Sequence, residues 1–135
     1  MKHFSAYISF DGNCRDAMTF YKECLGGELT IQEIKGSPIE NQCPPEMKDH
    51  VMHSTLANEK FILMASDMSR EKLQKGNNIG LLIACSSEEE IKSLFSKFSE
   101  GGKITDPLKV QFWGDTFGEL TDKFGIRWMF NYGKN

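Results

Sequence analysis

The chain has 135 residues, of which 39% are hydrophobic and 26% charged, and its formal net charge at pH 7 is −3. A chain of this size and composition forms one globular domain without needing disulfides or a structural metal. Its near-balanced charge offers no basic surface for a phosphate backbone, so we expect no nucleic acid partner. Its apolar runs are too short to cross a bilayer and its N-terminus lacks a signal-peptide core, so we expect a cytoplasmic protein with no membrane partner.

The first 35 residues alternate between strand and helix patterns. Residues 4–10 alternate apolar and polar side chains, which predicts a strand with Phe4 and Ile8 on its dry face and Tyr7 on the other. After a turn at 11–13, where Asn13 is a candidate cap, apolar residues at helical spacing predict a helix that Gly26-Gly27 ends. Residues 28–35 alternate again and predict a second strand.

Residues 36–49 contain three prolines and little periodicity, so we interpret them as a long loop and a candidate lid over a cleft. Two strands, 50–57 and 60–66, follow and are joined by the short turn Asn58-Glu59. A two-residue hairpin would place His53 opposite Met64, with both side chains on one face.

The second half opens with a polar linker over residues 67–77 and a strand over 79–85. Ser86-Ser87 and Glu90 resemble a capping box and predict a helix that Gly101-Gly102 ends. A strand from Lys103 then leads to the segment 112–128, where glycines punctuate short apolar runs in a strand, turn, strand pattern. We interpret this last segment as the rim and wall of a pocket.

The two halves of the chain resemble each other at an offset of 75 positions, which places Ile8 on Ile83, Phe20 on Phe95 and the first double glycine on the second. This match predicts one domain, 1–135, made of two β-α-β-β-β modules, 1–67 and 78–135. The fold class is α+β. We expect helices on the outer faces and a half-open, barrel-like mixed sheet around a shared cleft.

Several motifs also carry a family resemblance. They are Ile8-Ser9-Phe10-Asp11-Gly12-Asn13-Cys14-Arg15-Asp16-Ala17, Phe20-Tyr21-Lys22-Glu23, Val51-Met52-His53, Leu63-Met64-Ala65-Ser66-Asp67, Phe112-Trp113-Gly114-Asp115 and Thr121-Asp122-Lys123-Phe124-Gly125-Ile126-Arg127-Trp128. Together they resemble the PhnB-like branch of the glyoxalase/bleomycin-resistance group, the vicinal oxygen chelate superfamily. The resemblance implies paired βαβββ modules in a half-open barrel. Some members of this branch carry a ubiquinone-methyltransferase label, but this chain shows no glycine-rich loop of the kind that binds S-adenosylmethionine.

The resemblance also locates the metal ligands of the superfamily, usually His, Gln or Glu. Here those positions fall on Ser5, Met64, Gly80 and Met129. Glycine has no side chain, thioethers suit soft metals and a lone serine is a weak ligand, so we expect no metal site and no cofactor. His50 and His53 lie three apart in a predicted strand and would face opposite sides, which argues against a shared ion. The cysteines, Cys14, Cys24, Cys43 and Cys85, include no Cys-x-x-Cys pair, and we expect thiols rather than disulfides or zinc.

The candidate ligand-binding residues are those we expect to line the cleft, namely Tyr7, His53, Met64, Trp113, Asp115, Arg127 and Met129. His53 is a candidate catalytic base, or a histidine satisfied by its neighbours. Trp113 is a candidate shelf for a ligand, or core packing. Asp115 is a candidate ligand-binding group, or a cap of its own turn. Arg127 could grip a carboxylate or phosphonate, or could pair with Asp115 or Asp122.

Three functions fit this sequence. The first is a small-molecule binding protein without a metal, acting as a homodimer. The second is a glyoxalase-like lyase or dioxygenase-type enzyme that uses a divalent metal or acid-base chemistry by His53 or Asp115. The third is a partner-binding module that kept the fold and lost the chemistry.

Overall fold

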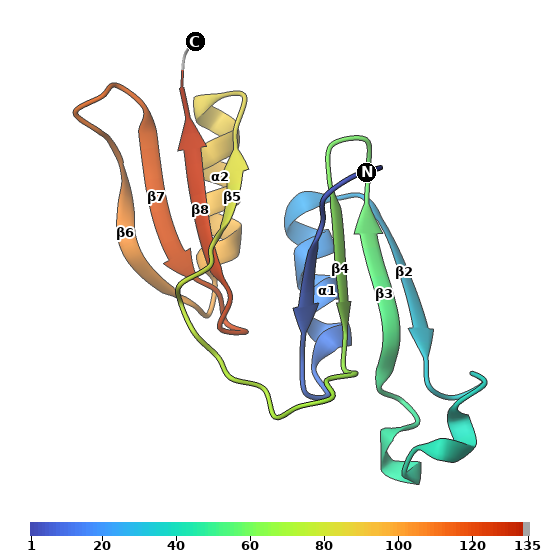
Figure 1. Cartoon of the computed structure of the whole chain (residues 1–135). Coiled ribbons are helices and arrows are strands. Elements are labelled where there is room, and N and C mark those ends of the chain that lie inside the picture. Colours follow the sequence, from blue (N-terminus) through green and yellow to red (C-terminus); the bar gives the residue numbers. More distant parts are fainter. Residues whose placement is uncertain (134–135) are drawn as a thin grey trace. The chain divides into compact units, whose positions relative to one another are not determined.

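The computed structural model of the chain describes residues 1–133, and within that range it holds two α-helices and eight strands. The strands form two four-stranded mixed sheets, ordered β1-β4-β3-β2 and β5-β8-β7-β6 (Figure 1). The two orders are equivalent, so the repeat predicted from the sequence and the α+β class are confirmed. The chain divides into two compact units, Met1–Gln74 and a second unit that begins at Lys75. The cleft between the modules stays a prediction.

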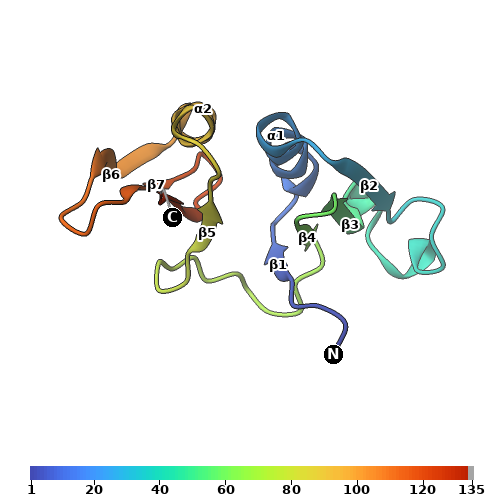
Figure 2. The same cartoon turned by 90° about the horizontal axis from the view of Figure 1, so that it is seen from above.

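The first module consists of β1 (Ala6–Ser9), α1 (Cys14–Leu25), β2 (Glu28–Glu33), β3 (Val51–Ala57) and β4 (Ile62–Ser66). β1 pairs with β4 in parallel and the other neighbours are antiparallel. Helix α1 lies over one face of this sheet and contacts β2, β3 and β4 (Figure 2). Its buried side includes Ala17, Phe20, Tyr21 and Cys24, as the helical spacing predicts. The opposite face of the sheet carries no helix of its own module.

The second module repeats this plan with β5 (Leu81–Ala84), α2 (Glu88–Ser99), β6 (Lys103–Val110), β7 (Thr116–Thr121) and β8 (Arg127–Tyr132). The predicted capping box is present, because Ser87 Oγ accepts from Glu90 N at 3.0 Å and Glu90 Oε1 accepts from Ser86 N at 2.8 Å. Helix α2 buries Ile91, Phe95 and Phe98 against one face of the sheet.

The double glycine that ends each helix has a steric cause. The strand after each helix begins directly beside the third strand of its module, since Glu28 pairs with Ala57 and Lys103 with Thr121. A Cβ on Gly27 would lie 3.0 Å from Ala57 O, and one on Gly102 would overlap Thr121 O. A side chain at either glycine would therefore separate the two strands.

Among the glycines of the segment 112–128, Gly114 and Gly125 lie in turns at positive φ. Gly118 instead lies inside β7, where a Cβ would meet the ring of Phe95 at 2.7 Å. The sequence pattern indicates a break at Gly118, and the structure shows close packing of α2 on the strand.

Two predictions about strands are wrong in detail. β1 begins at Ala6, so Phe4 lies outside it and is 94% exposed. The β3–β4 connection is longer than two residues, because Asn58 N donates to Phe61 O and its side chain accepts from Lys60 N and Phe61 N. Thr55, rather than His53, therefore pairs with Met64. The shift is two residues, so His53 keeps the predicted face.

The loop over residues 36–49 contains two 3-10 helices, η1 (Glu40–Gln42) and η2 (Pro45–Met47), and its role as a lid stays a prediction. All four cysteines are thiols rather than disulfides, and three of them are buried, as expected. Within residues 1–133, no helix is long and apolar enough to cross a membrane.

Candidate functional site

The helix-free face of the first sheet gathers three of the predicted ligand-binding residues from three strands. Tyr7 on β1 pairs with Met64 on β4, which pairs with Thr55 on β3. His53 lies two residues from Thr55 on the same face, and its Nε2 is 3.4 Å from Thr55 Oγ1. The Tyr7 and His53 rings lie 6.1 Å apart between centroids, and Tyr7 is 52% exposed. This face therefore presents a phenol, an imidazole and a thioether together.

The helix-free face of the second sheet gathers the corresponding residues of the other module. Trp128 packs on α2, with its ring 4.6 Å from that of Phe98. Arg127 and Met129, its neighbours on β8, therefore point to the opposite face. Met129 pairs with Leu82 on β5, which is 57% exposed, and with Glu119 on β7. The alternation expected for this strand is confirmed.

Arg127 forms an ion pair with Glu119, a partner that was not predicted from the sequence. Its NH2 lies 2.8 Å from Glu119 Oε2, and the two side chains are only 28% and 20% exposed. The hydrogen bond from Arg127 lowers the pKa of Glu119, and the same bond raises the pKa of Arg127. Neither Asp115 nor Asp122, the two partners suggested from the sequence, holds this arginine. Thr121 pairs with Arg127 and Glu119 pairs with Met129, so Glu119 lies diagonally across from Arg127 on the same face. No local pattern in the sequence marks this ion pair.

Trp113 and Asp115 lie in the turn that joins β6 to β7. Trp113 is 52% exposed, and its ring contacts Phe112 at 4.9 Å and Phe117 at 6.5 Å between centroids. Asp115 O accepts from Gln111 N across the turn, whereas the Asp115 carboxylate accepts from Asn131 Nδ2 on β8 at 3.0 Å. The carboxylate thus ties the turn to the sheet instead of capping its own backbone.

Two carboxylates outside these faces shape the turns beside them. Asp67 Oδ1 accepts from Gly12 N at 2.8 Å and Cys14 N at 3.1 Å, so Asp67 caps α1, whereas the Asn13 side chain makes no cap bond. Asp122 Oδ1 accepts from Phe124 N and Ile126 N, and its Oδ2 accepts from Trp128 Nε1. Both groups support the scaffold.

The four positions that the family resemblance indicated as metal ligands do not fit a divalent ion. Ser5 and Gly80 precede β1 and β5, and Met64 and Met129 lie on the helix-free faces. A Cβ on Gly80 would meet Met129 Cε at 3.0 Å, so a larger ligand residue would need that side chain to move. In residues 1–133 no three His, Cys, Asp or Glu side chains lie close enough to hold a metal together. The donor chemistry at these positions gives no charged or imidazole ligand.

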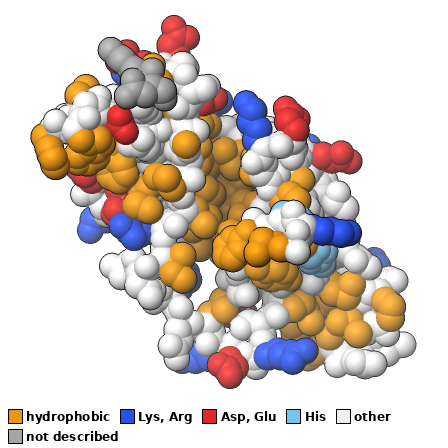
Figure 3. Space-filling view, turned by 45° about the horizontal axis from the view of Figure 1, so that its top comes forward, with side chains coloured by type: hydrophobic (Ala, Val, Ile, Leu, Met, Phe, Trp, Pro, Cys, Tyr) orange, Lys and Arg blue, Asp and Glu red, His pale blue; other side chains and the backbone are white. Residues whose placement is uncertain are grey.

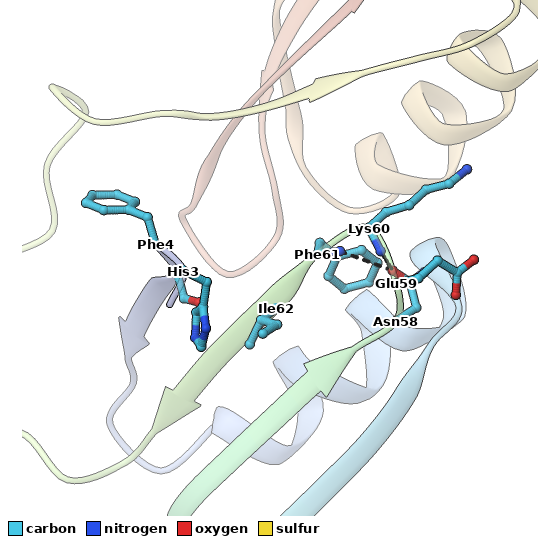
Figure 4. A pocket seen from close by; sticks show the side chains of 8 residues that line it. His3, Phe4, Asn58, Glu59, Lys60, Phe61 and Ile62 are labelled. Carbon is cyan, nitrogen blue, oxygen red and sulfur yellow. Dashed lines mark hydrogen bonds between the residues drawn. The ribbon is translucent and has the colours of Figure 1, made fainter. Parts of the chain in front are cut away.

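A small hollow near the end of the first sheet was missed from the sequence (Figure 4). It measures about 240 Å³ and is lined by His3, Phe4 and Ser5 of the N-terminal segment, by residues 58–61 of the β3–β4 connection and by Ile62 at the start of β4. Ser5 Oγ is buried without a hydrogen-bond partner among the described residues. The β3–β4 connection forms one wall of the hollow. The two-residue turn expected from the sequence is too short to form this wall, so the hollow was not predicted.

The strand-to-helix loops offer little to a nucleotide-like cofactor. Cofactors of this kind bind beside a glycine-rich loop that joins a strand to a helix in a parallel sheet. Here Asp67 already accepts from the N–H groups of Gly12 and Cys14, and Ser87 accepts from Glu90 N. Both sheets are mixed rather than parallel. The residues present therefore do not fit S-adenosylmethionine at either helix start.

Comparison with known proteins gives a consistent family assignment. A family model described as 3-demethylubiquinone-9 3-methyltransferase matches residues 2–130. Protein PA1353 from Pseudomonas aeruginosa is 34% identical, with 100% of each chain covered and a TM-score of 0.88. A PhnB protein from Bacillus cereus, also described as a 3-demethylubiquinone-9 3-methyltransferase, is 24% identical, with 98% of this chain and 100% of that chain covered and a TM-score of 0.81.

The fold extends to more distant proteins. A glyoxalase/bleomycin resistance protein/dioxygenase family enzyme from Burkholderia phytofirmans PsJN is 14% identical, with 95% of each chain covered and a TM-score of 0.64. At that identity the similarity shows the fold alone. The resemblance to PhnB-like and glyoxalase/bleomycin-resistance proteins found in the sequence is thereby confirmed.

Proposed function

Since the chain belongs to the 3-demethylubiquinone-9 3-methyltransferase family and has the glyoxalase/bleomycin-resistance fold, we propose that it binds a small organic molecule without a metal ion. The binding surfaces in this proposal are the helix-free faces of the two modules. The observation that supports this most is that Tyr7, His53 and Met64 share one helix-free face while Arg127 and Met129 share the other.

The side chains on these faces suit a ligand with an aromatic or apolar body. Aromatic rings and thioethers give large contact areas that adapt to flat molecules. Thr55 and His53 add hydrogen-bonding groups at the centre of the first face. We propose binding rather than methyl transfer, because the sequence has no glycine-rich strand-to-helix loop and both sheets are mixed rather than parallel.

A thermal-shift screen against aromatic compounds tests this proposal. The wild type is compared with a variant that carries a charge on one helix-free face. Leu82→Lys puts an ammonium on the helix-free face of β5, where Leu82 is 57% exposed. Ile104→Lys is the matched control on β6, since Ile104 is 48% exposed and pairs with Leu120, which is buried on the helix side. We expect stabilising compounds to lose their effect on Leu82→Lys and to keep it on Ile104→Lys. No stabilisation of the wild type by any compound would contradict the proposal and favour a partner-binding module.

The enzyme alternative depends on His53, the only imidazole on either face. Replacing His53 with alanine removes both the possible base and the contact with Thr55 Oγ1. If binding is the function, affinity for a stabilising compound should change several-fold, with no accompanying loss of a chemical step. Unchanged affinity would remove His53 from the site. A stoichiometric Zn, Ni, Mn or Fe in protein purified without chelator would contradict the metal-free proposal.

The proposal includes the homodimer expected from the sequence. Hydrophobic side chains lie at the surface in the space-filling view (Figure 3). On the β6–β7 hairpin, Val110 is 70% exposed and Phe112 is 98% exposed. Exposed apolar groups of this size often mark a protein contact, and a second copy of the chain would cover them. Light scattering coupled to size-exclusion chromatography measures the state directly, and a monomer at all concentrations would contradict this part.

A further inference from the structure

The helix-free faces differ sharply from anion-binding sites in their charges. Strands β1, β2, β3 and β4 contain no lysine or arginine at all. On strands β5, β7 and β8 of the second sheet, Arg127 is the one such cation. Recognition of a carboxylate or phosphonate in a protein depends on a cation whose donors are available.

Two of the five N–H donors of Arg127 are already engaged within the second module. Its NH2 donates to Glu119 Oε2 at 2.8 Å, and its NH1 lies 3.4 Å from Asn77 O. Glu119 is in turn held by Thr105 Oγ1 at 3.2 Å. An anion that approached Arg127 would meet the Glu119 carboxylate beside it, and would have to compete with that carboxylate for the guanidinium.

The remaining charges near the second face lie at its edge. β6, the edge strand, carries two lysines: Lys109 lies 3.9 Å from Asp106, and Lys103, which pairs with Thr121 and therefore shares the face of Arg127, is exposed at the first residue of the strand. Asp115 adds a carboxylate at the end of the second face, where Asn131 holds one of its oxygens. The central strands are therefore neutral or slightly acidic.

From these contacts we infer that the helix-free face of the second sheet binds an uncharged or cationic aromatic compound, and that the Arg127–Glu119 pair selects against anions. This inference rests on the proposed binding function and names the chemical class that the function would serve. It reverses the simplest interpretation of Arg127 from the sequence, in which the guanidinium grips a carboxylate or phosphonate. Glu119 supplies the selection because its charge remains beside any group that reaches Arg127.

Three probes with one ring system and different charges test the inference. They are 1-naphthylmethylamine, 1-naphthalenemethanol and 1-naphthaleneacetate, which are cationic, neutral and anionic at pH 7. Dissociation constants are measured by isothermal titration calorimetry at low and moderate salt. We expect the neutral or the cationic probe to bind at least about tenfold more tightly than the anionic one.

Glu119→Gln tests the role of the pair, because glutamine keeps the size and an acceptor oxygen but removes the charge. The anionic probe should gain at least about fivefold in affinity, since Arg127 is then left uncompensated. Glu88→Gln is the matched control: it removes the carboxylate of the Glu88–Lys92 ion pair on α2, where the two groups lie 3.2 Å apart. The control should leave the ratio of the three affinities unchanged.

The outcomes separate this inference from the function beneath it. Tightest binding of the anionic probe to the wild type, or an unchanged ratio in Glu119→Gln, would overturn the charge selection and leave small-molecule binding intact. Binding of none of the probes would overturn the binding function and this inference with it. If Glu119→Gln fails to fold, as judged by its circular dichroism, the wild-type ratio alone decides.

Discussion

Replacing Asp122 with asparagine should destabilise the second module by a predictable amount. The Asp122 carboxylate is 3% exposed and accepts from Phe124 N at 2.8 Å, Ile126 N at 3.0 Å and Trp128 Nε1 at 2.8 Å. Asparagine can keep its carbonyl oxygen on the two backbone donors, but its NH2 group then faces the indole N–H. A hydrogen bond to a charged group contributes about 1.5–3 kcal/mol, so we expect a loss of about 2–3 kcal/mol.

The free energy of unfolding is measured by urea denaturation monitored by circular dichroism. This signal is used instead of tryptophan fluorescence because a second variant, Trp128→Phe, lacks one of the fluorescent side chains. Removing the indole donor should partly relieve the conflict in the asparagine variant. The double variant Asp122→Asn/Trp128→Phe should therefore lose less stability than the sum of the losses in the two single variants, by at least about 1 kcal/mol. Asp67→Asn is the control, because Asp67 holds Val51 N at 2.8 Å in the other module and should combine additively with Trp128→Phe. Additivity within about 0.5 kcal/mol for the Asp122 pair would refute the reasoning.

Two further predictions follow from packing and burial. Gly102→Ala should cost about 1–3 kcal/mol in urea unfolding, because its Cβ would overlap Thr121 O, whereas Gly76→Ala, whose Cβ would meet nothing nearer than 3.8 Å, should stay within about 0.5 kcal/mol of the wild type. Equal effects of the two changes would contradict this account of the double glycine. Burial raises the pKa of the Cys14 and Cys85 thiols from 9.0 to about 11, so at pH 8 each holds roughly one hundredth of the usual thiolate. The half-exposed Cys43 should then react first with a thiol reagent, and rapid labelling of Cys14 or Cys85 in the native protein would be inconsistent with that burial.

The faces of the candidate site could be predicted because alternation in a strand is a local property. Ile8 and Trp128 are apolar and face the helix of their module, so their neighbours Tyr7 and Arg127 must face the opposite side. Even the wrong hairpin register kept His53 on the right face, because the error was an even number of residues. The partner of Arg127 could not be predicted in this way, since Glu119 is chosen by cross-strand pairing and by the length of the turn after β7.

The sequence by itself determined the duplicated α+β plan, because the period of the apolar residues and the helix-ending glycines are fixed by the local geometry of helices and strands. It also determined which donor atoms Ser5, Met64, Gly80 and Met129 can offer, because residue identity decides which atoms can act as ligands. Only the tertiary structure decided that Asp67, rather than Asn13, caps α1, and that Glu119 neutralises Arg127. Both contacts join residues that register and loop length bring together, and the energy of such a contact depends on distances that no local pattern encodes.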